Sequence, residues 1–123
     1  MRNMSFALTK TQIVDGSKTV TRRLGWVKLK AGDLIQPVSK CMGFKPGERI
    51  EKIRPPLKVI GVRREPLNLM IIDLDYGFEE CRLEGFGEHI FYQWPSEFVD
   101  MFCKTHKGCV PESVITRIEL GEP

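Results

Sequence analysis

The sequence predicts a single α+β domain in which a small, strongly bent β-sheet, closed or partly closed into a barrel, has short helices packed at one side. Two patterns predict this fold. Short alternating or β-branched runs occur in the first half and again at the end of the chain, whereas apolar residues from Leu67 to Phe102 fall at helical spacing. A length of 123 residues suits one domain, so we assign residues 1–123 to it, with a loop excursion at about 40–56.

The first half predicts strands interrupted by turns and one short helix. Gly16 should end that helix, because glycine readily adopts the left-handed conformation of a C-terminal cap. Pro37 should place its strand at a sheet edge or a bulge, since proline has no N–H to donate. The expected elements are a strand over Met4–Thr9, a helix over Lys10–Asp15, an extended segment over Thr19–Arg23 and, after the Lys30–Asp33 turn, a strand over Leu34–Ser39.

The second half predicts helices between two strands. Leu57–Arg64 is the clearest strand of the chain, and Glu65-Pro66 should end it. A helix over Ser96–Phe102 is favoured because Pro95 suits the first helical position. Val114–Leu120 alternates as a closing strand.

The charge of the chain is distributed unevenly. Residues 1–64 hold 15 Lys and Arg against 4 Asp and Glu, while residues 65–123 hold 4 against 12. A basic side of the fold would attract a polyanion such as RNA. The alternative is that the basic half pairs with the acidic half.

Targeting and cysteine patterns favour a cytoplasmic protein. No run of about 18 apolar residues is present, so we expect no membrane partner. The four cysteines are expected to be reduced thiols rather than a disulfide framework. Cys103, His106 and Cys109 are three zinc-ligand types, but their spacing is not that of a recognisable zinc site, so no metal and no cofactor are predicted.

The segment from Gly16 to Arg23 concentrates groups that bind or attack. In an extended strand Thr19, Thr21 and Arg23 would point one way, so Lys18 can meet Thr21 only from a turn before the strand. A solvated edge strand is the alternative interpretation. The residues expected to bind a ligand are Gly16, Ser17, Thr19, Arg22 and Arg23, together with Trp26 as a base-stacking aromatic.

Four motifs in order resemble an ASCH domain. They are Gly16-x-Lys18-Thr19-x-Thr21-x-Arg23, Lys30-Ala-Gly-Asp33-Leu, Glu84-Gly-Phe86 with Trp94 and Phe98 downstream, and Val114-Ile-Thr-Arg-Ile-Glu119. The resemblance implies a PUA-like barrel with a cleft beside it, and RNA or a nucleoside as ligand.

Some bacterial ASCH proteins that resemble this chain hydrolyse the amide of N4-acetylcytidine with a lysine, a threonine and a glutamate. These positions fall on Lys18, Thr21 and Glu84, which the resemblance makes the candidate catalytic residues. A lysine whose pKa is lowered by burial or by nearby cations could activate a threonine hydroxyl. A close Lys–Glu pair would instead raise the lysine pKa, and Glu84 could also belong to a solvated helix face.

Three functions therefore remain open. The chain is an RNA- or nucleoside-binding module, an amidohydrolase acting on an acylated cytidine, or a metal-independent ribonuclease. The sequence predicts no particular protein partner.

Overall fold

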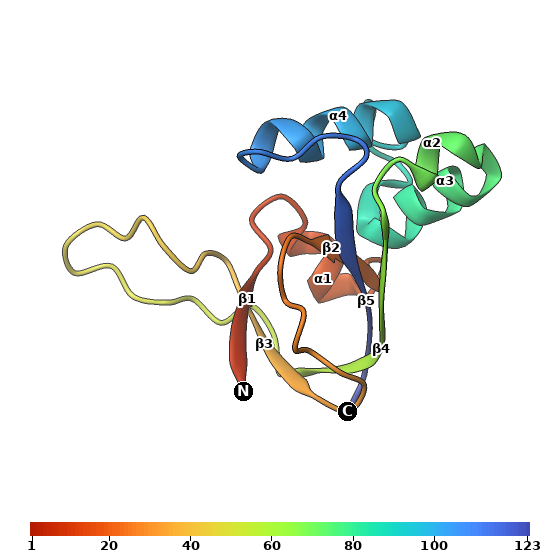
Figure 1. The fold of residues 1–123 in the computed structure, drawn as a ribbon. Coiled ribbons are helices and arrows are strands. Elements are labelled where there is room, and N and C mark those ends of the chain that lie inside the picture. The colour runs from red at the N-terminus through yellow and green to blue at the C-terminus, as the bar shows by residue number, and fades with distance from the viewer.

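The computed structural model describes residues 1–123 and contains one five-stranded mixed sheet with short helices (Figure 1). The strand order is β1-β3-β4-β5-β2, with β1 parallel to β3 and the other neighbours antiparallel. The elements are β1 (Arg2–Ser5), α1 (Lys10–Asp15), β2 (Val20–Arg23), β3 (Leu34–Val38), β4 (Leu57–Pro66), α2 (Leu69–Ile72), α3 (Leu74–Cys81), the π-helical turn η1 (Arg82–Phe86), α4 (Pro95–Thr105) and β5 (Val114–Gly121).

The sheet is open, so the expected closed barrel is not found, and a partly closed barrel is not confirmed. β1 and β2 are its two edge strands and do not pair with each other. A side-chain hydrogen bond connects these two edges: Arg23 Nη2 on β2 donates to the Ser5 carbonyl on β1 at 2.7 Å. The α+β class with helices beside a small sheet is confirmed.

Two strand predictions need correction. The strand expected over Met4–Thr9 is β1 at Arg2–Ser5, because its partner β3 ends at Val38, opposite Ser5. Pro37 lies in an interior strand rather than an edge strand. β4 pairs with β3 only at Leu34 and Ile35, so no β4 residue requires a donor from Pro37.

The helical region agrees with the sequence pattern. α4 begins at Pro95, and α1 ends at Gly16, whose φ of 84° is left-handed. α3 lies directly against α2 at Gly77, where an added Cβ would meet the Met70 carbonyl oxygen at 1.9 Å. Figure 1 shows α2, α3 and α4 grouped at one end of the sheet, away from both termini.

Two buried clusters form the core. The first joins α1 to the sheet and consists of Met4, Phe6, Ile13, Ile35, Leu57, Val59, Ile118 and Leu120. The second joins α2, α3 and α4 to the sheet and consists of Leu67, Met70, Cys81, Phe86, Phe98, Val99, Phe102 and Ile115. Burial of these side chains is the main force that holds the helices on the sheet.

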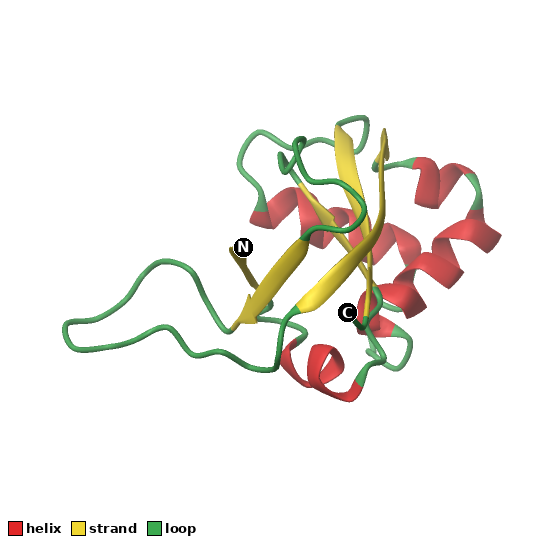
Figure 2. Cartoon of the chain, turned by 90° about the horizontal axis from the view of Figure 1, so that it is seen from below, coloured by secondary structure: helices red, strands yellow, loops and turns green.

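Residues 40–56, here called the arm, form the predicted loop excursion. The arm stands away from the body of the molecule in both views (Figures 1 and 2). Its base is closed by backbone hydrogen bonds from Ser39 to Glu51 and from Ile53 to Pro37.

No helix has the length and apolar content that crossing a bilayer would require.

Candidate functional site

Lys18 lies in the turn between α1 and β2, as the strand geometry predicted. The Gln12 carbonyl accepts hydrogen bonds from the N–H groups of both Gly16 and Lys18, at 3.1 Å each. Thr19 then donates its N–H to the Leu83 carbonyl at 2.9 Å, which brings this turn against η1. The local backbone therefore places Lys18 beside Glu84 from the far half of the chain.

Lys18 and Glu84 form a buried ion pair. Lys18 Nζ lies 2.7 Å from Glu84 Oε1, and both side chains are only 4% exposed. The same Nζ donates to the Glu84 backbone carbonyl at 2.8 Å. Burial lowers the pKa of Lys18 below its usual range, although Glu84 opposes this shift. The effect of burial on the pKa of Lys18 is thus larger than the opposing effect of the ion pair. This balance could not be predicted from the sequence.

The break in η1 explains how Glu84 offers both its carboxylate and its carbonyl to Lys18. Gly85 has a φ of 94°, which ends the helical path directly after Glu84. An ordinary residue would be strained in this conformation, and its Cβ would come within 3.2 Å of Lys18 Cβ. The alternative of a solvated helix face for Glu84 is wrong, because Glu84 and Glu80 are buried and only the neighbouring Glu79 is exposed.

Arg22 holds Glu84 in place from the side opposite Lys18. Its Nη1 is 3.4 Å from Glu84 Oε2, and its Nη2 is 2.6 Å from Glu80 Oε1 and 3.3 Å from Glu65 Oε2. The Arg22 side chain has no exposed surface, and its Nε has no hydrogen-bond partner. These contacts show that Arg22 holds the three carboxylates together, and its predicted contact with a ligand stays a prediction.

Glu80 connects Arg22 to β5. Both of its carboxylate oxygens accept from Arg117, with Nη2 to Oε2 at 3.0 Å. Burial alone would raise the pKa of Glu80, but Arg117 and Arg22 outweigh it and lower the pKa to about 2.

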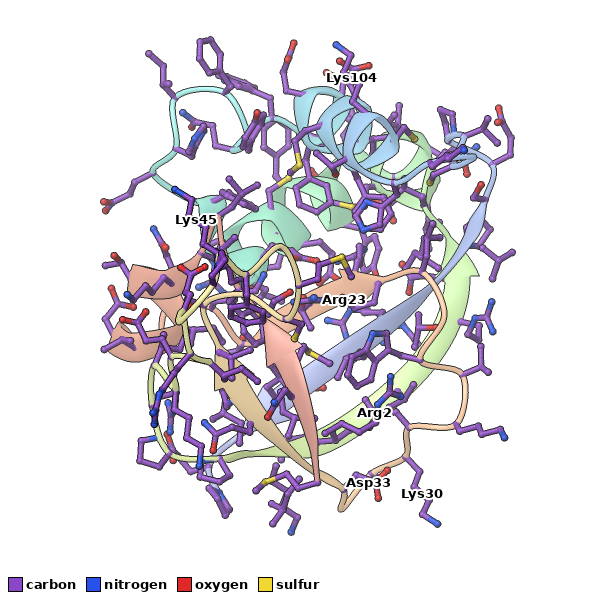
Figure 3. All side chains as sticks on the ribbon, turned by 90° about the vertical axis from the view of Figure 1, so that its left-hand side faces the viewer. Arg2, Arg23, Lys30, Asp33, Lys45 and Lys104 are labelled. Carbon is purple, nitrogen blue, oxygen red and sulfur yellow. The ribbon has the colours of Figure 1, made fainter.

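Thr21 is buried and bonded to Arg23. Arg23 Nε donates to Thr21 Oγ1 at 3.1 Å, and the Arg23 guanidinium lies 4.8 Å from the centre of the Phe6 ring. In Figure 3, Arg23 lies between the sheet and α4, on whose outer side Lys104 is found. Thr21 and Arg23 share one face of β2, as predicted.

These residues line one pocket of about 470 Å³, here called the candidate pocket. This volume is typical of a small-molecule site. Its polar side contains Lys18, Thr21, Arg22, Arg23 and Glu84. The rest of the pocket lining is mostly apolar or aromatic and consists of Ser5, Phe6, Ala7, Leu8, Thr9, Phe86, Phe98, Met101, Phe102, Thr105 and His106. Because Phe6 belongs to the first core cluster and Phe98 to the second, the pocket lies between the two.

The other predicted ligand-binding residues lie elsewhere. Gly16, Ser17 and Thr19 line a separate polar pocket of about 660 Å³ with Asp15, Arg82, Glu88 and His89, among others. Trp26 packs against the first core cluster, and the Arg2 guanidinium lies 3.8 Å from the centre of its ring. The structure therefore brings Lys18, Thr21, Arg22, Arg23 and Glu84 together, but not Gly16, Ser17, Thr19 or Trp26.

Sequence reasoning missed the network residues and most of the pocket wall. Glu65 and Tyr76 complete the ionic network, since the Tyr76 hydroxyl donates to Glu65 Oε2 at 2.7 Å. The i,i+4 spacing of Glu80 and Glu84 was a usable signal, because it puts both carboxylates on one helix face. Phe98 and Phe102 share such a face too, but nothing in the sequence indicated that it borders a pocket.

The cysteines and histidines do not gather around a metal position. No group of three His, Cys, Asp or Glu side chains is arranged to hold a metal ion. Cys103 Sγ and Cys109 Sγ are 3.8 Å apart, while His106 Nδ1 is 2.8 Å from the Phe102 carbonyl oxygen. Cys103 is half-buried.

The fold and site together define a small α+β protein whose open mixed sheet carries a pocket over a buried Lys–Glu pair. No family model and no curated protein matches the sequence. Among solved structures, it is similar to protein EF3133 from Enterococcus faecalis V583, which is described by the family model DUF984. The TM-score is 0.54 at 13% identity, over 97% of this chain and 76% of that one. This similarity concerns the fold alone, and the ASCH resemblance stays a prediction.

Proposed function

We propose that the candidate pocket binds a modified nucleoside, either free or within RNA. The observation that carries the proposal is the buried Lys18–Glu84 pair, whose nitrogen and oxygen lie 2.7 Å apart beside an aromatic wall. A nucleobase has flat faces that suit the rings of Phe86, Phe98 and Phe102, and a polar edge that suits charged donors and acceptors. The proposal also rests on the resemblance to ASCH domains, whose cleft lies beside a small barrel.

Hydrolysis of an N4-acyl amide is the second candidate function, favoured by the hydrogen bonds of Lys18. A neutral lysine amine has two N–H groups, and Glu84 offers it two acceptors, Oε1 and the backbone carbonyl. The nitrogen lone pair would then be free to accept a proton. Because burial lowers the pKa of Lys18, its neutral form is more accessible than that of an exposed lysine.

Thr21 would be the nucleophile of this reaction. Its oxygen accepts a hydrogen bond from Arg23, so its own proton is not used in that bond. The proton passes to Lys18 as the Thr21 oxygen bonds to the acyl carbon. The C–N bond then breaks, and the cytosine amine leaves with the proton from Lys18. Water hydrolyses the resulting ester, which releases the acid and restores Thr21.

The arm supports RNA rather than a free nucleoside as the ligand. Lys40 pairs with Glu48 at 2.8 Å within the arm, whereas Lys45, Arg49 and Lys52 are exposed and have no carboxylate partner. Exposed cations without partners are available to phosphates. The arm would contact the RNA backbone on either side of a nucleotide held in the pocket.

Turnover of N4-acetylcytidine tests the hydrolysis, and calorimetric binding tests the pocket. We expect wild-type protein to release cytidine, as measured by chromatography. Thr21→Ala should reduce turnover by at least about a thousandfold while leaving the affinity for N4-acetylcytidine within about threefold. Thr21→Ser retains a hydroxyl and is the matched control, which should keep measurable turnover.

Each outcome separates the candidate functions. Binding without turnover in the wild type would eliminate the amidohydrolase and keep the binding module. Equal turnover in wild type and Thr21→Ala would eliminate Thr21 as nucleophile. Metal-independent cleavage of a single-stranded oligoribonucleotide, run beside this assay, would point to the ribonuclease instead. Absence of binding would contradict the proposal itself.

A further inference from the structure

α4 ends in a turn that returns the chain to the helix. The Cys109 N–H donates to the His106 carbonyl at 3.0 Å, and Gly108 has a φ of 81°. This positive φ is the one that a type II turn requires at its third residue. The turn brings Cys109 Sγ to 3.8 Å from Cys103 Sγ on the last turn of α4.

We propose that Cys103 and Cys109 are a redox modification site, at which a reversible disulfide rearranges the α4 end of the candidate pocket. Both thiols are free and partly exposed. A disulfide requires the two sulfur atoms at about 2.05 Å, so they must move closer together than their present 3.8 Å. The inference does not depend on which ligand the pocket binds.

Two residues of the pocket wall lie in the loop of chain that this disulfide would close. Thr105 and His106 both line the pocket, and both lie between Cys103 and Cys109 in the sequence. His106 stacks on Phe102, another wall residue, with ring centres 4.0 Å apart. Drawing Cys109 toward Cys103 displaces the turn that begins at His106, and with it this part of the wall.

The chemistry needs a disulfide co-reactant such as oxidised glutathione. Burial and the neighbouring Cys109 raise the pKa of Cys103 to about 11, so its thiolate is scarce at neutral pH. The Cys109 thiolate attacks one glutathione sulfur, and the other glutathione leaves as a thiol. Cys103 then attacks the Cys109 sulfur and releases the second glutathione. The protein loses two hydrogens, and oxidised glutathione is reduced to two thiols.

The other two cysteines provide internal comparisons. Cys81 is fully buried, and burial raises its pKa to about 12, so it should stay unmodified. Cys41 is exposed on the arm and has no other cysteine sulfur within hydrogen-bond distance, so it should form only a mixed disulfide with glutathione. Replacing it with serine removes that competing reaction, and Cys41 is not a lining residue of the candidate pocket.

Mass spectrometry tests the modification on the full-length Cys41→Ser protein after incubation with oxidised glutathione. We expect the loss of two hydrogens and a peptide in which Cys103 is linked to Cys109, both reversed by dithiothreitol. In the matched Cys41→Ser, Cys103→Ser protein, Cys109 should instead retain one glutathione. Free thiols or separate glutathione adducts on Cys103 and Cys109 would overturn the proposal.

Proton NMR of the imidazole rings tests the link to the pocket. The chain has only two histidines, and His89 lies outside the candidate pocket. Oxidation should shift the His106 resonances and leave those of His89 in place. A disulfide that forms without moving the His106 resonances would refute the rearrangement of the wall.

Discussion

Arg22 is the residue on which the carboxylates of the site converge. Its guanidinium contacts Glu65, Glu80 and Glu84, and its side chain has no exposed surface. A buried pair rarely gains much over an apolar replacement of both partners, but removal of one partner leaves an uncompensated charge. Arg22 therefore matters for stability because its removal would leave three buried carboxylates without their cation.

Replacing Arg22 with methionine should lower the free energy of unfolding by about 3 to 5 kcal/mol, because three buried carboxylates lose their shared cation. Urea unfolding followed by circular dichroism measures this change. Arg82→Gln is the matched control, since Arg82 forms an exposed pair with Glu79 and should leave the unfolding midpoint unchanged. Equal midpoints for Arg22→Met and wild type would contradict the structural role.

The positions of Glu84 and Glu80 show which features of the site could be predicted from the sequence. The meeting of Lys18 with Glu84 was expected from a family resemblance, because no local pattern connects residues 66 positions apart. The burial of Glu80 was not predicted, since Glu79, Glu80 and Glu84 at helical spacing also fit a solvated face. Which side of a short helix is buried depends on what packs against it, and here that is Arg22 and Arg117.

At the scale of elements, the break in η1 determines where Glu84 lies. A Cβ at Gly85 would come within 2.9 Å of Gln12 Cβ and 3.2 Å of Lys18 Cβ. The left-handed φ of 94° adds strain for any other residue. The contact between α1, the turn at Lys18 and η1 thus requires glycine at this position.

Gly85→Ala should destabilise the protein by about 2 kcal/mol or more and weaken nucleoside binding, because η1 must move away from Lys18. Gly16→Ala is the matched control. Gly16 has a similar φ of 84° but no atom within 4 Å of an added Cβ, so only the backbone cost of about 1 kcal/mol applies. Urea midpoints of the two variants measure the difference, and equal loss would argue against the close approach.

The elements that local patterns specify were predicted best. α1 with its Gly16 cap, α4 from Pro95, and the strands β4 and β5 follow from spacing and capping residues. The parallel pairing of β1 with β3 and the open sheet were not predicted, because strand pairing depends on distant contacts rather than on local periodicity. The short pairing of β3 with β4, which ends at Ile35, likewise could not be predicted and explains why Pro37 is tolerated inside the sheet.

At the scale of the whole molecule, charges from the two halves of the chain pair with each other, some of them buried and some at the surface. Lys18, Arg22, Arg54 and Arg63 from the basic half pair with carboxylates from the acidic half. The alternative of internal pairing is thus correct for these residues. Other cations of the basic half have no ion pair and remain available to a polyanion, among them Lys45, Arg49 and Lys52 of the arm.

Acid should destabilise the whole fold through Glu80. Its pKa is about 2 in the folded protein, below the ordinary value of 4.5, so the folded state favours the carboxylate. This stabilisation is complete above about pH 4.5 and is lost as the pH falls toward 2. Urea unfolding across this range should show a loss of about 2 kcal/mol after allowance for solvent screening. A Glu80→Gln protein with the wild-type pH dependence would contradict this assignment.

Neutralising the cations of the arm should weaken RNA binding and make the affinity less dependent on salt concentration. We expect Lys45, Arg49 and Lys52 changed together to Gln to reduce the slope of log affinity against log salt by about 2 for a single-stranded oligoribonucleotide. Fluorescence anisotropy at several salt concentrations measures the slope. The matched control changes Lys28, Lys30 and Lys58, which are exposed outside the arm, and Figure 3 shows Lys30 well apart from Lys45. An equal reduction in both variants would argue against a role for the arm.

Backbone amide NMR during titration with N4-acetylcytidine locates the ligand on the structure. We expect chemical-shift changes concentrated at Thr21, Glu84 and Phe102, which line the candidate pocket. Shifts concentrated instead at Asp15, Gly87 and His89 of the polar pocket, or none at millimolar ligand, would contradict it.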